Sequence, residues 1–199
     1  MSATTFAALM LFSFVSSITP GPNNFMLFAS GVNFGVRRTV PHMFGIALGF
    51  GVLLAAIGAG LGVVFQLYPP AFIAVKIIGS AYMIWLAWRI YKSGPVEIEA
   101  GKARPMTFME AALFQWVNPK AWMMATYAMA AYTSEGTYAF SVALVVFAFV
   151  VVNFPSVAVW AVFGVSMRRF LQNPRSLKAF NTTMALALVA SLWPMLTAG

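Results

Sequence analysis

Two short stretches hold the residue types that could do chemistry in this chain. The first is SSITPGPNN (residues 16–24), in which two prolines flank a glycine and two asparagines follow. The second is QWVNPK (residues 115–120), in which an asparagine and a proline precede a lysine. Each proline removes a backbone N–H donor, so both stretches predict a break in any helix that contains them. A broken backbone survives at membrane depth only inside protein or beside a water-filled cavity, which makes each break a candidate site.

Each break also predicts the start of a new helix. Pro22 and Pro119 would stand first in these helices, a position that proline favours, after Gly21 and Asn118 as N-caps. A helix N-terminus offers free N–H groups and the positive end of the helix dipole. Two such ends that face each other would attract a carboxylate.

The helices that precede the breaks predict the complementary half of the site. They would end near Ser17 and near Trp116 or Val117, leaving free carbonyls that suit an ammonium group. A site with both halves would hold an amino-acid zwitterion at its two ends. We therefore predict substrate-binding roles for the residues of both breaks and for an asparagine in a later apolar run: Thr19, Pro20, Gly21, Pro22, Asn23, Asn24, Gln115, Asn118, Pro119, Lys120 and Asn153. An interhelical hydrogen bond is an equal alternative for Asn153.

Composition places the site in a membrane protein. The 199 residues are 61% hydrophobic and 8% charged, whereas soluble domains carry about 25% charged residues. The chain has no cysteine and no aspartate and only one histidine, which disfavours disulfides, thiol chemistry and transition-metal sites. We expect one transmembrane domain over residues 1–199, with no cofactor and no nucleic-acid partner. We attribute the net charge of +8 to loops that face anionic lipid.

Six apolar runs are long enough to cross a bilayer as a helix, which takes about 20 residues. The predicted fold is therefore an all-α integral membrane protein with six transmembrane helices, at about residues 6–31, 40–66, 71–92, 107–132, 138–164 and 178–197. Among the five loops, only the first, third and fifth carry basic residues. By the positive-inside rule these loops are cytoplasmic and both termini lie outside.

The two halves of the chain match each other. Pro20 and Pro119 are 99 residues apart (119 − 20), and the second and fifth runs start at a similar offset. Three runs per half place the second half upside down relative to the first. We thus predict two inverted three-helix repeats, at about residues 1–93 and 106–199, with helices 1 and 4 broken near the bilayer midplane. This pattern is typical of secondary transporters.

Three further features complete the expected picture. Glu110 is the one acidic side chain near a run that could take part in proton coupling. His42 is expected to be a solvated residue at the cytoplasmic end of the second run. Small-residue spacing predicts close helix packing for a group of glycines, Gly31, Gly35, Gly45, Gly49, Gly51, Gly58, Gly60 and Gly62.

The chain resembles the LysE/RhtB family of bacterial amino-acid exporters over essentially its whole length. The resemblance rests on TPGPNN (residues 19–24), NPKA (118–121) and GSAYMIWLAW (79–88), together with the glycines at 31, 35, 45 and 49. The sequences of residues 19–24 and 82–88 look most similar to those of the cysteine and O-acetylserine exporter branch. The resemblance implies efflux of amino acids across the bacterial inner membrane, driven by the proton-motive force.

We expect a small neutral amino acid or a derivative as the substrate, because no aspartate and no deep glutamate is present to pair a cationic side chain. The expected partners are this substrate and the lipid bilayer, with a homodimer left open. Alternatives are an exporter of another small solute or ion, an intramembrane hydrolase using Ser16 or Ser17 with Lys120, and a structural subunit. Known metal sites need carboxylates, imidazoles or thiolates, which the runs almost lack.

Overall fold

The computed structural model describes residues 1–92, 104–190 and 192, and this part of the chain is helical with no strand. Its elements are α1 (Ala3–Ile18), α2 (Pro22–Ala56), the π-helix η1 (Ile57–Leu61), α3 (Gly62–Leu67), α4 (Pro69–Lys92), α5 (Phe108–Phe114), the 3-10 turn η2 (Gln115–Val117), α6 (Pro119–Tyr132), the turn η3 (Glu135–Thr137), α7 (Tyr138–Met167), the turn η4 (Phe170–Gln172) and α8 (Pro174–Ala190). The predicted loop charges Glu97, Glu99 and Lys102, and residues 191 and 193–197 of the sixth run, lie outside the described residues.

Both predicted breaks are confirmed. α1 ends at Ile18, and α2 begins at Pro22 with Gly21 as its N-cap. The fourth run is divided into α5, η2 and α6, and Pro119 is the first residue of α6. The side chain of Asn118 accepts a hydrogen bond from the backbone N–H of Lys120 at 3.1 Å, as an N-cap should.

α2 is itself two helices joined by a turn at Gly35. Gly35 has φ 77° and ψ 169°, a conformation that side chains rarely adopt, so the prediction that it serves helix packing is wrong. The first run therefore continues to Phe34 rather than 31, and the second begins at 36 rather than 40. A buried hydrogen bond of 2.8 Å between the hydroxyls of Ser30 and Thr39 holds the two helices against each other.

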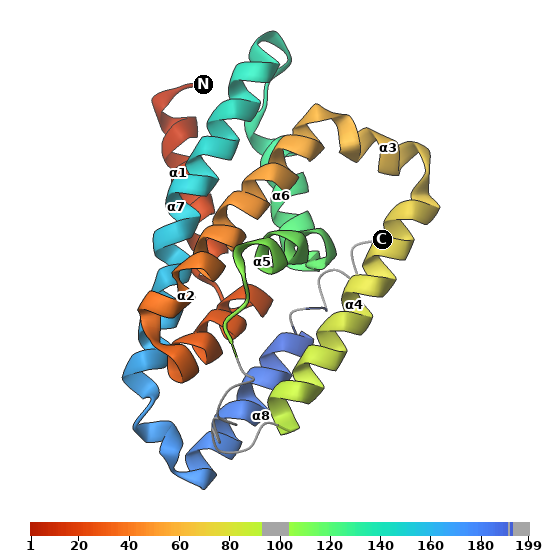
Figure 1. Cartoon of the computed structure of the whole chain (residues 1–199). Coiled ribbons are helices and arrows are strands. Elements are labelled where there is room, and N and C mark those ends of the chain that lie inside the picture. Colours follow the sequence, from red (N-terminus) through yellow and green to blue (C-terminus); the bar gives the residue numbers. More distant parts are fainter. Residues whose placement is uncertain (93–103, 191, 193–199) are drawn as a thin grey trace.

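Most of the other glycines do allow close packing, as predicted. A Cβ added to Gly31 would collide with the carbonyl of Ala161 on α7, and one added to Gly45 would collide with the backbone of Phe108 at the start of α5. α2 thus contacts α7 and α5 backbone against backbone, and Figure 1 shows these helices side by side at the centre of the molecule. The exceptions besides Gly35 are Gly60 and Gly62. Gly60 has φ 109° in η1 and nothing within 4 Å of its Cβ position, and the Cβ position of Gly62 meets only the nearby Ile57 side chain at 3.6 Å.

The helices expose an apolar outer surface. Leu11 is 64% exposed, Phe147 62% and Ile77 63%, which is typical of side chains that face lipid rather than water. Within the described residues, two segments have the length and hydropathy of a membrane span: Pro22–Leu61, which includes the turn at Gly35, and Glu135–Met167. These observations fit a helical membrane protein, while the count of six spans stays a prediction.

Basic residues gather at one end of the molecule. The turn at Gly35 is followed by Arg37 and Arg38, and η4 is preceded by Arg168 and Arg169. Figure 1 shows both turns at the lower end together with the end of α4, whereas the N-terminus and the α6–α7 turn lie at the upper end.

Candidate functional site

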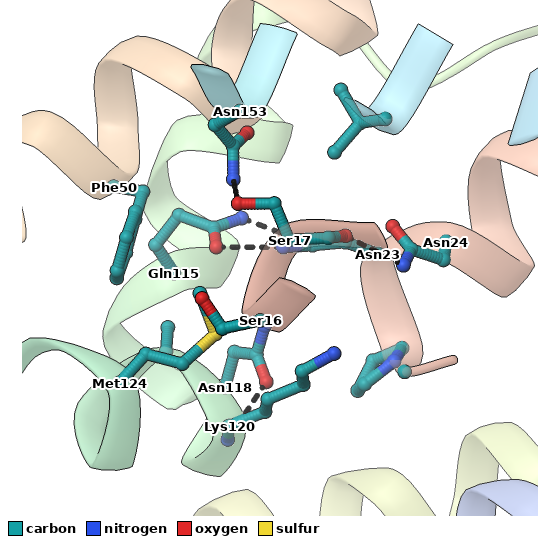
Figure 2. A pocket seen from close by; sticks show the side chains of 14 residues that line it. Ser16, Ser17, Asn23, Asn24, Phe50, Gln115, Asn118, Lys120, Met124 and Asn153 are labelled. Carbon is teal, nitrogen blue, oxygen red and sulfur yellow. Dashed lines mark hydrogen bonds between the residues drawn. The ribbon is translucent and has the colours of Figure 1, made fainter. Parts of the chain in front are cut away.

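The two breaks meet in one cavity near the centre of the molecule (Figure 2). Its volume is about 320 Å³ when the part open to solvent is counted. The cavity brings together eight of the predicted site residues: Gly21, Pro22, Asn23, Asn24, Gln115, Asn118, Lys120 and Asn153. The remaining three flank it, because Thr19 and Pro20 bind the Lys120 side chain and Pro119 starts α6.

Two amides tie the first break to the second. Asn23 Nδ2 donates to Gln115 Oε1 at 2.8 Å, and Gln115 Nε2 donates back to Asn23 Oδ1 at 3.1 Å. Gln115 Nε2 also donates to the carbonyl of Ala111 at 2.9 Å, and its side chain is fully buried. This pair fixes the start of α2 against η2 and forms one wall of the cavity.

The carbonyls at the end of α1 already have partners, so the prediction that they are free is wrong. Asn24 Nδ2 donates to the carbonyls of Ser17 at 3.0 Å and Thr19 at 2.7 Å, and Trp160 Nε1 donates to that of Ile18 at 3.0 Å. At the second break, Trp122 Nε1 donates to the carbonyl of Trp116 at 2.9 Å. Side chains from other turns thus satisfy the groups that the breaks release.

Asn153 makes an interhelical hydrogen bond and also lines the cavity, so it has features of both predicted roles. Its Nδ2 donates to the hydroxyl of Ser17 at 3.1 Å, which is the expected interhelical hydrogen bond between α7 and α1. Its Oδ1 is buried without a hydrogen-bond partner among the described residues, and the side chain lines the cavity. Asn153 therefore keeps one unused acceptor at the site.

Lys120 connects the two breaks through its ammonium group. Nζ donates to the carbonyl of Thr19 at 2.6 Å, to the Thr19 hydroxyl at 2.9 Å and to the carbonyl of Pro20 at 3.3 Å. A Cβ placed on Gly21 would lie only 3.2 Å from Nζ and 2.8 Å from Cδ of Lys120. The ammonium therefore occupies the junction between the end of α1 and the start of α2.

The two helix starts differ in capping. Gly21 has no side chain to cap α2, and within the described part of the chain no side chain caps the N–H groups of this helix. α6, in contrast, has Asn118 on its first free N–H. An anion in the cavity would meet the uncapped start of α2 and the neighbouring ammonium of Lys120.

Six lining residues were not predicted to bind substrate: Ser16, Ser17, Phe50, Ala121, Met124 and Val157. Two of them carry a signal that could have been used, because Met124 and Val157 each follow a predicted site residue by one helical turn. Phe50 reaches the cavity from the middle of α2, a placement that depends on tertiary packing alone.

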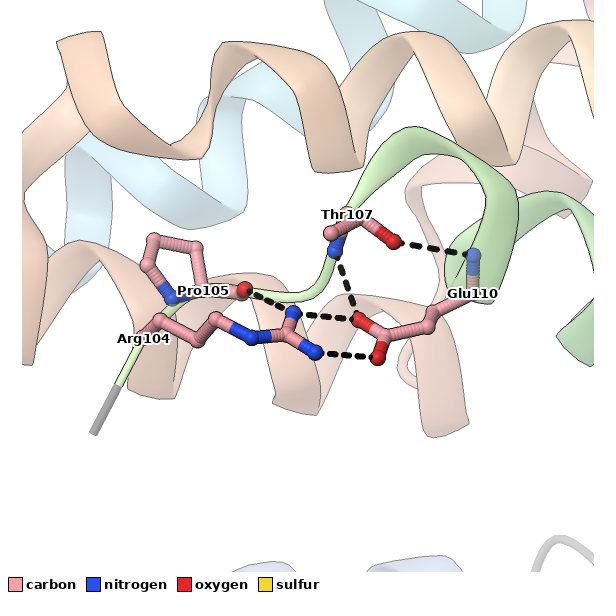
Figure 3. A network of polar contacts seen from close by, with 4 residues as sticks. All are labelled: Arg104, Pro105, Thr107 and Glu110. Carbon is pink, nitrogen blue, oxygen red and sulfur yellow. Dashed lines mark hydrogen bonds and ion pairs between the residues drawn. The ribbon is translucent and has the colours of Figure 1, made fainter. Parts of the chain in front are cut away.

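Glu110 lies outside the central cavity (Figure 3). Its carboxylate forms a bidentate ion pair with Arg104, with distances of 2.7 and 2.6 Å, and accepts the backbone N–H of Thr107 at 2.8 Å. The Thr107 hydroxyl in turn accepts from the N–H of Glu110, which completes a capping box at the start of α5. Glu110 does not pair with Lys120, and its role in proton coupling stays a prediction.

His42 is buried, which corrects the expectation of a solvated residue. Only 1% of its surface is exposed, and neither ring nitrogen has a hydrogen-bond partner in the described structure. The cause is the turn at Gly35, which starts the second helical part of α2 about one turn earlier than predicted. His42 therefore lies well inside that helix instead of at its end.

Broken helices that meet at a polar cavity inside an apolar bundle define a membrane transport protein rather than an enzyme. The chain belongs to the family of LysE type translocators, whose model matches residues 14–191. It is 31% identical over 195 residues to proteins named cysteine/O-acetylserine efflux protein from Escherichia coli strain K12 and from Shigella sonnei strain Ss046. In each case 95% of this chain and 96% of the relative are covered. No solved structure matches the chain.

Proposed function

We propose that this protein exports small neutral amino acids, or derivatives such as O-acetylserine, from the cytoplasm. The observation that carries the proposal is the position of the Lys120 ammonium, between the carbonyls of Thr19 and Pro20 and the uncapped start of α2. This junction offers both halves of a zwitterion site within a few ångströms. The names of the relatives support the class of substrate.

We infer an exchange of partners when the substrate binds. The substrate carboxylate would lie against the N-terminus of α2, where the dipole and the Lys120 ammonium attract it. Lys120 would then turn from the Thr19 carbonyl toward the carboxylate, and the substrate ammonium would take its place on the carbonyls. Each state keeps one ammonium on the Thr19 and Pro20 carbonyls at the end of α1, so the number of donors to these carbonyls is conserved.

The cavity lining supports a neutral side chain on the substrate. None of the described residues that line it is an acid, and the wall beyond the polar groups is made by Phe50, Met124 and Val157. A cationic side chain would enter this low-dielectric site without a counter-charge.

Cells that overproduce the protein should therefore release serine-, cysteine- or O-acetylserine-like compounds, and should not preferentially release lysine or arginine. The measurement is the amino-acid content of the medium, compared with cells that produce a Lys120→Ala variant at the same level. Selective efflux of lysine or arginine would contradict the proposed substrate class.

We also propose that the basic end faces the cytoplasm of a bacterium, with six spans arranged as two inverted repeats and both termini outside. The clustering of Arg37, Arg38, Arg168 and Arg169 at one end supports this orientation. The starts of α2 and α6, each with a proline at its first position, support the repeat.

The orientation has a direct test. Alkaline phosphatase, which is active only in the periplasm, should be active when fused after Gly199 and silent when fused after Gly101. A cytoplasmic reporter such as green fluorescent protein should give the opposite pattern at the same two sites. Phosphatase activity at Gly101 together with silence at Gly199 would show the opposite topology. The proposed orientation would then no longer support export.

We propose the proton-motive force as the driving force and retain Glu110 as the candidate for coupling. Its carboxylate is partly exposed and is held in a bidentate pair with Arg104, which protonation would release. The predicted consequence of this scheme is efflux that stops when an uncoupler removes the proton gradient.

A further inference from the structure

A second cavity lies toward the basic end of the molecule, between the first helical part of α2, the end of α4 and the segment that precedes α5. Its volume is about 770 Å³, including the part open to solvent. Its polar lining comes from Ser30, Asn33, His42 and Arg104. None of these residues lines the central cavity.

Two of these side chains have buried polar atoms without partners. Both ring nitrogens of His42 and Oδ1 of Asn33 make no hydrogen bond within the described structure. Buried polar atoms are paired in the great majority of cases, and each unpaired one costs about 1–3 kcal/mol. Replacing them with apolar groups would remove this cost. Because both side chains line one cavity, we take these unpaired atoms to indicate a polar ligand that completes them.

The fold holds these groups firmly in place. The turn at Gly35 folds the chain back so that Asn33 and His42, on the two helical parts of α2, line the same cavity. The Ser30–Thr39 hydrogen bond closes that turn. Arg104 is fixed at the rim by Glu110 and by the carbonyl of Pro105 (Figure 3). Three contacts use only some of its five N–H donors.

The position of this cavity relates it to the central one. The helical part of α2 that runs from Pro22 to Phe34 has its start at the central cavity and its end at the second cavity. Asn24 and Asn33 are nine residues apart (33 − 24), or about 14 Å along a helix. A substrate that comes from the basic end would reach the second cavity first.

We propose that the cavity of His42 and Asn33 is an entry site, which binds the amino-acid zwitterion before it passes to the central cavity. This inference rests on the proposed export function. Asn33 Oδ1 accepts no hydrogen bond within the described structure, so it would accept one from the substrate ammonium. The N–H of His42 and the free N–H groups of Arg104 would donate to the carboxylate.

The absence of cysteine allows a test by ligand protection of single introduced thiols. We would place one thiol in each cavity, as Ala29→Cys in the entry site and Met124→Cys in the central site, and a third in the η3 turn as Gly136→Cys. Ala29 and Met124 line their respective cavities, and Gly136 has open space around it. The full-length protein is reconstituted in lipid nanodiscs, and maleimide labelling is followed over time with and without O-acetyl-L-serine.

O-acetyl-L-serine should slow the labelling of Ala29→Cys and of Met124→Cys at least fivefold and should leave Gly136→Cys unchanged. Adding His42→Leu or Asn33→Leu should abolish protection of Ala29→Cys and leave protection of Met124→Cys within twofold. Adding Lys120→Ala should do the reverse. Two independent variants of the entry site guard against a single one that misfolds, and retained protection of Met124→Cys shows that each is folded. The exposed Gly136→Cys controls for any effect of the ligand on the labelling reagent.

Protection of Met124→Cys alone would overturn the entry site while leaving the export function in place, and the second cavity would then hold water only. Protection of Ala29→Cys that survives both His42→Leu and Asn33→Leu would also overturn it, because the named groups would not be the ones that bind. Protection at neither position would contradict both the entry site and the amino-acid substrate.

Discussion

Lys120→Ala is expected to lower amino-acid efflux by more than tenfold without preventing membrane insertion. A hydrogen bond to a charged group contributes about 1.5–3 kcal/mol, and about 1.4 kcal/mol corresponds to a factor of ten. Lys120 makes its contacts at the junction of α1 and α2, where the proposed zwitterion binds. The variant loses the attraction for the carboxylate and leaves the Thr19 and Pro20 carbonyls one donor short.

Three comparison variants separate this role from packing and from topology. Lys120→Met keeps most of the length of the side chain and should be as inactive as Lys120→Ala. Lys120→Arg should retain little efflux, because the planar guanidinium is larger than the ammonium and sits beside Gly21, where space is short. Lys178→Ala removes an exposed lysine at the basic end and should transport like the parent.

The measurement is efflux from cells with matched amounts of each protein in the membrane. If Lys120→Met exports like the parent, the ammonium and its contacts to Thr19 and Pro20 are dispensable, and Lys120 does not bind the substrate. If Lys178→Ala lowers efflux equally, the loss of efflux in Lys120→Ala reflects the lower net charge of the protein rather than a role at this site.

Local features of the sequence were sufficient to predict both breaks and both helix starts. A proline at a first helical position needs no tertiary contact to act, and neither does the capping side chain of Asn118. The breaks also brought seven predicted residues to one cavity, because each break places several polar residues within a few positions of one another. The depth of each break in its run was enough to predict that they meet.

Features that depend on distant residues could not be predicted in the same way. The carbonyls at the end of α1 are satisfied by Trp160, about 140 positions away in sequence, and by Lys120. No local pattern identifies such donors. His42 was misplaced because its burial follows from the conformation of one residue, Gly35, whose neighbours also fit a simple packing motif.

Gly21→Val is expected to abolish export because of the side chain that lies beside Gly21, not because of its backbone conformation. Gly21 has φ −177° and ψ 178°, an extended conformation that any residue adopts, so the backbone itself does not require glycine. The restriction comes from Lys120, whose Cδ would lie 2.8 Å from an added Cβ. A branched side chain would push the ammonium away from the Thr19 carbonyl and cover the uncapped start of α2.

A double-mutant cycle distinguishes this contact with Lys120 from a general effect of the substitution on folding. Gly21→Ala should lower the melting temperature of the purified protein in the parent background and should cost little in a Lys120→Ala background, where the space is empty. Coupling of this kind is expected only for residues in contact. Gly136→Ala, at a position with nothing within 4 Å, should have no effect in either background. Equal losses from Gly21→Ala in both backgrounds would show that the lysine is not the cause, and normal efflux by a well-expressed Gly21→Val variant would remove the junction of α1 and α2 from the transport site.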